Sequence, residues 1–311
     1  MNLKSPFATL LRSLPIEKRE VVVLGSTTRY WIYGDPDADT TVVISHGYRG
    51  EHHGLEPVIA QLPSVRFIGP DLPGFGESTP LQEVKHSIDG YASWLIAFVD
   101  ALGLTGKAVI LGHSFGSIIS AAAIAKGLPT PGLILVNPIS VSGLDGPRPF
   151  ATMVTVWYYG LAGKLPERLG IALLKSWLIV QLMSMSLVKT RDKALRKWIH
   201  REHHTYFSNF ASRDVVVEGF DASVSANVSD FAVDINVPTL LVAAELDDIT
   251  PVAAHAPVVE AIGNATLVVL PKVGHLIHYE TPVPAARAIE AFLSTLLPPN
   301  SIRPLSLDQN S

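Results

Sequence analysis

The sequence predicts an α/β protein with a mostly parallel central sheet, helices on both faces of that sheet and an inserted helical cap. Short apolar runs, typical of buried strands, alternate with helical patterns over residues 41–136 and again over 239–297. Such alternation indicates parallel strands joined by crossover helices. Residues 139–232 break the alternation and are mostly helical in pattern, which indicates an insertion over the carboxyl edge of the sheet.

The elements of the first part follow from local patterns. Two apolar or alternating runs on either side of Gly25 and Ser26 favour an antiparallel hairpin, and a leading segment with a short helical turn precedes it. Further apolar runs predict strands, and apolar residues at helical spacing predict helices. In order, we expect strands at 20–24, 30–33, 41–45, 65–68, 108–111 and 133–136, and helices at 55–62, 88–103 and 118–125.

The insertion and the second part complete the chain. Residues 143–149 have a loop-like composition, and residues 151–213 are mostly helical in pattern. Strands at 239–243 and 265–270 and helices at 252–262 and 283–297 then extend the sheet. We therefore divide the chain into a core part, 1–138, a cap, 139–232, a second core part, 233–298, and a flexible polar tail, 299–311.

The pentapeptide Gly112–Gly116, Gly-His-Ser-Phe-Gly, lies between an apolar strand and a helix of small residues. A serine on a sharp strand-to-helix turn has a strained backbone, and flanking glycines remove side chains that would clash. Such a turn exposes the Ser114 hydroxyl at the edge of the sheet. The backbone N–H of Phe115, at the start of the helix, can there face a developing oxyanion. The pattern predicts Ser114 as a nucleophile.

A serine nucleophile needs a base, and the base needs an orienting acid. Two candidate acids, Asp247 and Asp248, follow the next-to-last predicted strand. Two candidate bases, His275 and His278, follow the last strand. The order of serine, acid and histidine along the chain matches that of hydrolases with this kind of turn.

In these motifs the chain resembles the α/β-hydrolase family, in the branch of serine hydrolases with a helical cap. The resemblance covers about residues 20–138 and 233–297. It implies the α/β-hydrolase fold and the activity of a carboxylic ester hydrolase. The motifs that carry it are His46–Gly50, Asp71–Ser78, Gly112–Gly116, Asp247–Pro251 and Gly274–His275.

The resemblance also selects the residues of the site. The family spacing between the acid and a following proline, here Pro251, selects Asp247, and a glycine before the histidine selects His275. The family implies a second oxyanion donor, the backbone N–H of Tyr48. Ser117 stands where many members have a second glycine, and we expect it to affect helix packing only.

The predicted chemistry is acyl transfer through an acyl-enzyme. His275 would take the Ser114 proton, Asp247 would fix the imidazole, and the N–H groups of Tyr48 and Phe115 would bind the oxyanion. A serine rather than an aspartate at the turn argues against the dehalogenase and epoxide-hydrolase branches of the family. The alternatives are an acyltransferase, a C–C bond hydrolase or a cofactor-free haloperoxidase with the same residues, and a ligand-binding sensor on the same scaffold.

Composition narrows the function further. The chain has 311 residues, a net charge of −4 and no cysteine, so nothing indicates nucleic acid, and disulfides and thiolate catalysis are excluded. No dinucleotide-binding or Walker motif indicates a cofactor. The pairs His52-His53 and His203-His204 lack the ligand spacing of a metal site, and we interpret His46 and His113 as structural. We expect neither a cofactor nor a metal.

The composition of the cap indicates the class of substrate and the cellular location that we expect. Its many large apolar residues predict a pocket for an apolar acyl substrate. Residues 143–213 contain eleven Lys or Arg against four Asp or Glu, and the basic segment 189–201 directly follows the apolar run 169–188. This pattern is typical of a segment that rests on an anionic bilayer, and the rival interpretation is a solvated face beside a run buried on the sheet.

The N-terminal segment gives no indication of export, and the apolar run of the cap is a poor candidate for a membrane span, though not a negligible one. The first residues lack a long apolar segment, which argues against a secretory signal, and Lys175 and Gln181 interrupt the apolar run of the cap. We therefore expect a cytoplasmic protein that can associate peripherally with anionic membrane.

Overall fold

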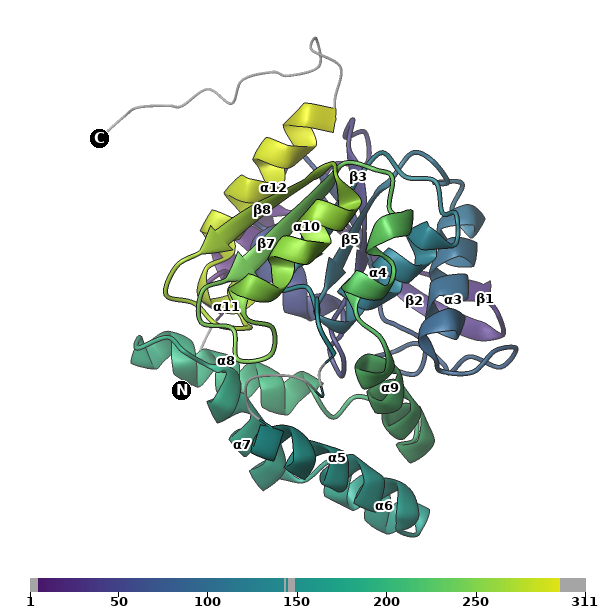
Figure 1. Ribbon diagram of the computed structural model, residues 1–311, viewed down its shortest axis with the longest axis vertical. Coiled ribbons are helices and arrows are strands. Elements are labelled where there is room, and N and C mark those ends of the chain that lie inside the picture. The colour runs from purple at the N-terminus through teal and green to yellow at the C-terminus, as the bar shows by residue number, and fades with distance from the viewer. Residues whose placement is uncertain (1–4, 143, 145–148, 297–311) are drawn as a thin grey trace.

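The computed structural model describes residues 5–142, 144 and 149–296, and it confirms the α/β architecture (Figure 1). Eight strands form one sheet in the order β1-β2-β4-β3-β5-β6-β7-β8. Neighbours from β4 to β8 are parallel, whereas β1 and β2 form an antiparallel hairpin at one edge. The bounds are β1 Ile16–Val23, β2 Ser26–Tyr33, β3 Thr41–Ser45, β4 Arg66–Pro70, β5 Val109–His113, β6 Leu133–Val136, β7 Thr239–Ala244 and β8 Ala265–Leu270.

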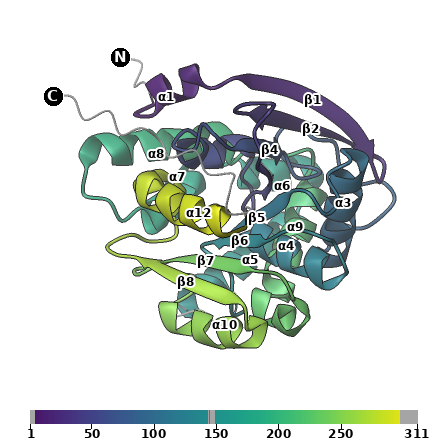
Figure 2. The ribbon, with the colours of Figure 1, turned by 90° about the horizontal axis from the view of Figure 1, so that it is seen from above.

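Helices cover both faces of the sheet (Figure 2). Buried residues of α3 (Ile88–Ala101), α4 (Phe115–Ala125) and α10 (Ala256–Ile262) pack on one face, and those of α2 (Glu56–Ile59) and α12 (Pro282–Leu296) pack on the other. The short elements between them are α1 Ala8–Ser13, η1 His52–Leu55, η2 Val228–Asp230, η3 Ala232–Asp234, η4 Val252–His255 and α11 Ile277–Glu280.

The central strands contribute to both core layers. On β3, Val42 and Ile44 belong to the layer under α2 and α12, and Val43 belongs to the layer under α3 and α4. All three side chains are at most 2% exposed, and each such burial stabilises the fold by about 1.5–3 kcal/mol. Because both faces are covered, these strands are continuous apolar runs in the sequence, which explains why the local pattern located them.

Five helices occupy the chain between β6 and β7 and form a separate layer at the bottom of Figure 1. The N-termini of two of these helices are stabilised by side-chain hydrogen bonds. Asp192 accepts from the first N–H groups of α8, and Ser212 accepts the Val215 N–H of α9. We propose that these helices form the cap that the sequence predicts for residues 139–232. Their bounds are α5 Pro149–Lys164, α6 Glu167–Leu174, α7 Trp177–Leu187, α8 Lys193–Tyr206 and α9 Arg213–Ser225.

The apolar run of the cap forms α6 and α7 and is largely exposed. The segment Glu167–Leu187 is long and apolar enough to cross a membrane by length and composition only, which does not contradict the expectation of a poor candidate drawn from Lys175 and Gln181. Only 22% of its 18-residue apolar window is buried. The rival interpretation of a run buried on the sheet is therefore wrong.

Other differences from the predicted elements have local causes. β1 begins at Ile16 rather than at residue 20, because its first residues are exposed and show no apolar pattern. The helix predicted at 55–62 is a 3-10 turn followed by the four residues of α2. α11 was not predicted, because four residues are too few to give a helical period. The loop expected at 143–149 lies, apart from Leu144 and Pro149, outside the described residues, and so does the tail at 299–311.

The close approach of α4 to the sheet can be tested at Gly116. A Cβ on Gly116 would lie 1.9 Å from the Ser45 carbonyl oxygen of β3. We expect Gly116→Ala to lower the free energy of unfolding by about 1–3 kcal/mol, because the backbone must shift. The matched control is Gly160→Ala on α5, where a Cβ would meet no described atom within 4 Å; it should be neutral or stabilising. Denaturant unfolding measures both, and equal effects would contradict the steric argument.

Candidate active site

Ser114 lies on a strained turn between β5 and α4. Its φ of 52° and ψ of −118° cost a non-glycine residue about 1–3 kcal/mol. Its N–H donates to the Val136 carbonyl at the end of β6 (3.0 Å), and its carbonyl accepts from the Ser117 N–H (2.8 Å). A Cβ on Gly112 would lie 2.4 Å from the Gly116 carbonyl oxygen, so the turn requires the glycines that the sequence places there.

A chain of hydrogen bonds joins Ser114, His275 and Asp247. His275 Nε2 lies 2.8 Å from Ser114 Oγ, and His275 Nδ1 lies 2.8 Å from Asp247 Oδ2. The three residues follow β5, β8 and β7, whose parallel directions deliver them to the same edge of the sheet. His275 and Asp247 are buried, whereas Ser114 is half-buried. Chemically, such a chain can activate a serine hydroxyl as a nucleophile.

Asp247 is surrounded by hydrogen-bond donors. Its Oδ1 accepts the N–H groups of Ile249 (2.8 Å) and Thr250 (3.3 Å), and its Oδ2 also accepts from Asn137 Nδ2 (3.0 Å). Burial alone would raise the pKa of Asp247, but the neighbouring His275 and these donors outweigh it and lower the pKa. Sequence reasoning missed Asn137, although its position directly after β6 was the signal that could have identified it.

The proposed oxyanion donors lie next to Ser114. Phe115 is the first residue of α4, where a helix provides no internal partner for the N–H. Tyr48 follows Gly47, and a Cβ on Gly47 would lie 3.4 Å from Ser114 Cβ. Tyr48 and Phe115 line the same cavity as Ser114, and their rings meet edge to face at 6.1 Å. The positions of both residues fit the role that the sequence predicts.

Arg49 ties the loop after β3 to the cap. Its side chain is 2% exposed, and no carboxylate pairs with it among the described residues. Its Nε donates to the Phe207 carbonyl (2.9 Å), its Nη2 to the Leu174 carbonyl (2.8 Å) and its Nη1 to the Tyr159 hydroxyl (3.4 Å). Leu174 is the last residue of α6, and Phe207 directly follows α8; at these helix ends the carbonyls lack helix partners and carry partial negative charge. Helix ends therefore compensate this buried cation.

Ser117 has a larger role than helix packing. Its Oγ donates to the Ser114 carbonyl (2.5 Å) and accepts the N–H of Ile139 (3.1 Å), where the chain leaves β6. The expectation that Ser117 affects helix packing only is therefore wrong, because the hydroxyl bridges the turn of Ser114 to the neighbouring strand end.

The two alternatives left open by the local pattern have other partners. Asp248 forms an ion pair with Lys189 Nζ at the cap side of the cavity. His278 is buried on α11, and its ring packs against that of His113 at 4.3 Å. The hydrogen bonds to Ser114 and between base and acid are made by His275 and Asp247 instead.

Burial lowers the pKa of three other imidazoles around the site. Burial lowers the pKa of His113 to about 3 and the pKa of His278 well below its usual value. Burial also lowers the pKa of His46, which donates from Nδ1 to the Gly47 carbonyl (2.8 Å) and accepts the Leu72 N–H at Nε2 (2.8 Å). We interpret His46 and His113 as structural.

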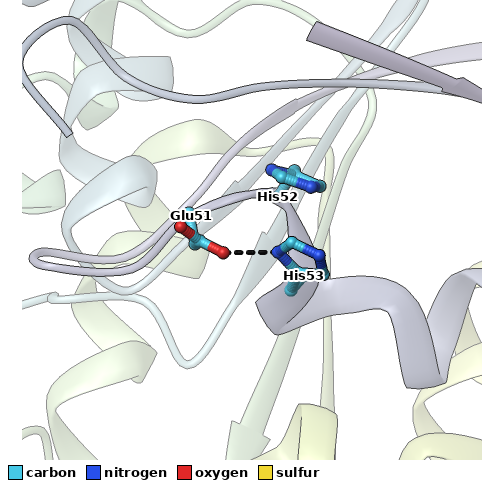
Figure 3. A group of neighbouring side chains, drawn as sticks. All are labelled: Glu51, His52 and His53. Carbon is cyan, nitrogen blue, oxygen red and sulfur yellow. Dashed lines mark hydrogen bonds and ion pairs between the residues drawn. The ribbon is translucent and has the colours of Figure 1, made fainter. Parts of the chain in front are cut away.

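Glu51, His52 and His53 form a compact group with ligand atoms within 4.8 Å of one another (Figure 3). The structure brings carboxylates to both histidines, which the spacing in the sequence did not reveal. His53 Nδ1 pairs with Glu51, and His52 Nδ1 lies 2.7 Å from Asp71 Oδ1. The two rings lie 3.8 Å apart and are tilted by 39°. Each histidine of the group thus has a carboxylate partner, and the absence of a metal stays a prediction.

A cavity of about 380 Å³ lies beside Ser114. Its volume is in the range of binding sites for small organic ligands. Its lining is mainly apolar and, among the described residues, contains no Lys or Arg. The loops of the core and the helices of the cap both contribute, including Tyr48, Phe115, Met183, Leu187, Phe207, Phe220, Ile249 and Leu276.

The eight-stranded sheet, the turn of Ser114 and the helices inserted after β6 together define an α/β hydrolase. The chain belongs to the family of α/β hydrolases described as "Serine aminopeptidase, S33", whose model matches residues 36–282. This confirms the family resemblance that the sequence motifs indicate, and the chain is a hydrolase of this superfamily.

Individual relatives and solved structures are also α/β hydrolases or share that fold. The chain is 27% identical over 266 residues to a 2-hydroxy-6-oxononadienedioate/2-hydroxy-6-oxononatrienedioate hydrolase of Pseudomonas putida, covering 81% of this chain and 87% of that protein. It is 23% identical to Lipase 3 of Moraxella sp., covering 84% of this chain and 80% of the lipase. A thermophilic esterase from Thermogutta terrifontis shares the fold, with a TM-score of 0.71 and 21% identity over 90% of this chain and 99% of the esterase.

The bridging role of Ser117 gives a test with a matched control. Ser117→Ala should lower the free energy of unfolding by about 1–3 kcal/mol, because the Ile139 N–H would be left buried without its acceptor. Ser120→Ala on the same helix should be neutral, because the buried Ser120 Oγ has no hydrogen-bond partner among the described residues. Denaturant unfolding of both variants decides, and equal losses would mean that the bridge contributes nothing.

Proposed function

We propose that the protein is a cofactor-independent serine hydrolase that cleaves carboxylic esters of an apolar acyl group. Ser114 is the proposed nucleophile, His275 the base and Asp247 the orienting acid. One observation carries the proposal: the hydrogen-bonded chain from Asp247 through His275 to Ser114 reaches an apolar cavity of about 380 Å³.

The proposed reaction has two halves. His275 Nε2 takes the proton of Ser114 Oγ while that oxygen attacks the carbonyl carbon of the ester, and Asp247 stabilises the imidazolium. The N–H groups of Phe115 and Tyr48 bind the oxyanion of the tetrahedral intermediate. Its collapse breaks the ester bond, and His275 returns the proton to the leaving alcohol. Water then attacks the acyl-enzyme with the same base, releasing the acid and restoring Ser114.

The lining of the cavity supports a substrate that is apolar and uncharged near the reacting carbonyl. An anionic group buried there would find no Lys or Arg among the described lining residues and would meet the carboxylates of Glu51 and Asp248. Burying such a charge without a partner is costly. An ester, thioester or lipid-like acyl group fits this lining.

The similarity to the Pseudomonas putida hydrolase makes C–C bond hydrolysis a second candidate. The name of that protein specifies a dienedioate, which carries two carboxylates. The cavity described here has no cation among its described lining residues to receive them, so ester hydrolysis remains the preferred function.

We also propose peripheral association with anionic membrane, on the basis of the exposed apolar run at Glu167–Leu187 and the basic α8 that follows it. A cytoplasmic location stays a prediction.

The role of Ser114 can be tested with a fluorophosphonate probe and with p-nitrophenyl esters of increasing acyl length. The native protein should be labelled and should turn over neutral apolar esters, whereas Ser114→Ala should lose both properties. Its melting temperature should stay level or rise, because residues at active sites are rarely optimal for stability. Ester turnover by the purified variant at the native rate would refute the assignment. If the probe does not label the native protein but a ligand strongly raises its melting temperature, the alternative of a ligand-binding sensor on the same scaffold would be favoured over a hydrolase.

The acid can be tested against its neighbour. Asp247→Asn should lower kcat by orders of magnitude, because an amide donating to His275 Nδ1 favours the wrong imidazole tautomer. Asp248→Asn, which removes the ion pair with Lys189, should change kcat by less than about tenfold, because that pair is partly exposed. Steady-state kinetics on one ester measure both, and the reverse result would make Asp248 the acid.

A further inference from the structure

Two helices of the cap have one face toward the cavity and the opposite face toward solvent. On α7, Met183 and Leu187 line the cavity, while Leu178, Leu182 and Met185 are exposed. On α5, Thr152 and Thr155 line the cavity, while Trp157 and Leu161 are exposed on the other side. The roof of the cavity is therefore a single layer of helices. We call its outward side chains the outer cap face, which comprises Trp157, Leu161, Trp177, Leu178, Leu182 and Met185.

The outer cap face gathers much of the exposed apolar surface. Trp157 is 77% exposed, Trp177 65% and Leu178 61%. Of the eighteen large apolar residues that are exposed among the described residues, ten lie on α5, α6 and α7. The spacing on α7 is that of one helical stripe. A concentration of exposed apolar residues on three consecutive helices, rather than single scattered residues, indicates a surface that binds a partner.

The charges beside the outer cap face indicate what it binds. Residues 149–201 contain nine Lys and Arg against two Asp and Glu, while the whole chain has a net charge of −4. Lys164 and Arg168 lie at the junction of α5 and α6, and Arg191, Lys193 and Lys197 lie on or just before α8, which packs against α7; all five are exposed. A second copy of this chain would bring the same positive charge to the contact, whereas an anionic lipid surface brings the opposite charge.

We propose that the outer cap face docks on the surface of a bilayer that contains anionic phospholipid. Its apolar side chains enter the boundary between headgroups and acyl chains, and the flanking cations meet the lipid phosphates. Trp157 and Trp177 suit this depth, because tryptophan concentrates at membrane interfaces. Docking goes beyond the proposed hydrolysis and does not depend on it. It places one layer of helices between the lipid and the cavity of Ser114.

The tryptophans provide a direct readout of docking. Of the five in the chain, Trp31, Trp94 and Trp198 are at most 9% exposed, so brominated lipids can quench only Trp157 and Trp177 in the folded protein. We expect quenching by vesicles of brominated phosphatidylcholine that contain phosphatidylglycerol. Quenching should weaken without phosphatidylglycerol and in high salt, because salt screens the attraction to anionic lipid.

Vesicle co-sedimentation of variants identifies the surface. We expect an apolar triple variant, Trp157→Gln/Leu178→Gln/Leu182→Gln, to lose vesicle binding. We expect a charge triple variant, Arg191→Gln/Lys193→Gln/Lys197→Gln, to bind vesicles about a hundredfold more weakly. The matched control is the double variant Val22→Gln/Val233→Gln, which removes exposed apolar side chains on β1 and η3, outside the outer cap face, and should bind as the native chain does. Unchanged melting temperatures would show that the variants are folded. Because co-sedimentation measures vesicle binding, the test is independent of enzymatic activity.

Three results would overturn the proposal. The first is a native chain that binds no vesicle at any phosphatidylglycerol content. The second is an apolar variant that binds as tightly as the control. The third is a native dimer in solution that the apolar variant converts to a monomer, with no vesicle binding, which would assign the outer cap face to a second copy of the chain.

Discussion

The close contact between α4 and β3 at Gly116 is the constraint on which the rest of the structure depends. A side chain at this position would meet the Ser45 carbonyl oxygen at 1.9 Å, so the helix can approach the sheet only because no side chain is there. The approach forces the chain to reverse within the turn of Ser114, which explains the positive φ of that residue. The strain is local and is compensated by the burial of α4, whose residues 115–124 are all buried.

With α4 packed against the sheet, the neighbouring strands place the residues of the candidate site around the start of this helix, in the order of the strands. The order β3, β5, β6, β7, β8 delivers Tyr48, Ser114, Asn137, Asp247 and His275, one after the end of each strand. Residues up to 227 positions apart in the chain thus become neighbours because the strands are parallel and adjacent. The hydrogen bonds of 2.8 Å at His275 require each strand end to be correctly placed, and the sheet provides this through its register.

The parts that could be predicted from the sequence are those with local causes. Buried parallel strands are apolar runs, and a strand-to-helix turn with glycines restricts where Ser114 can stand. The bridge from Ser117 to Ile139 could not be predicted, because no motif links a serine after the turn to a backbone N–H 22 residues away. Asn137, which donates to Asp247, could have been identified only by its position at the end of β6. The exposure of α7 could not be predicted from the sequence either, because an apolar run has the same sequence whether or not another element covers it. Short elements such as α11 leave no periodic pattern.

The three hydrogen bonds of Arg49 to the cap have a consequence for the engineering of this chain. An inserted cap is often treated as a module that can be exchanged between related scaffolds. Here the carbonyls of Leu174 and Phe207 compensate a buried guanidinium that belongs to the scaffold. A foreign cap without those two helix ends would leave that charge stranded, which costs several kcal/mol. Residue 49 and these two helix ends therefore depend on each other, and a chimera with a foreign cap has to exchange both.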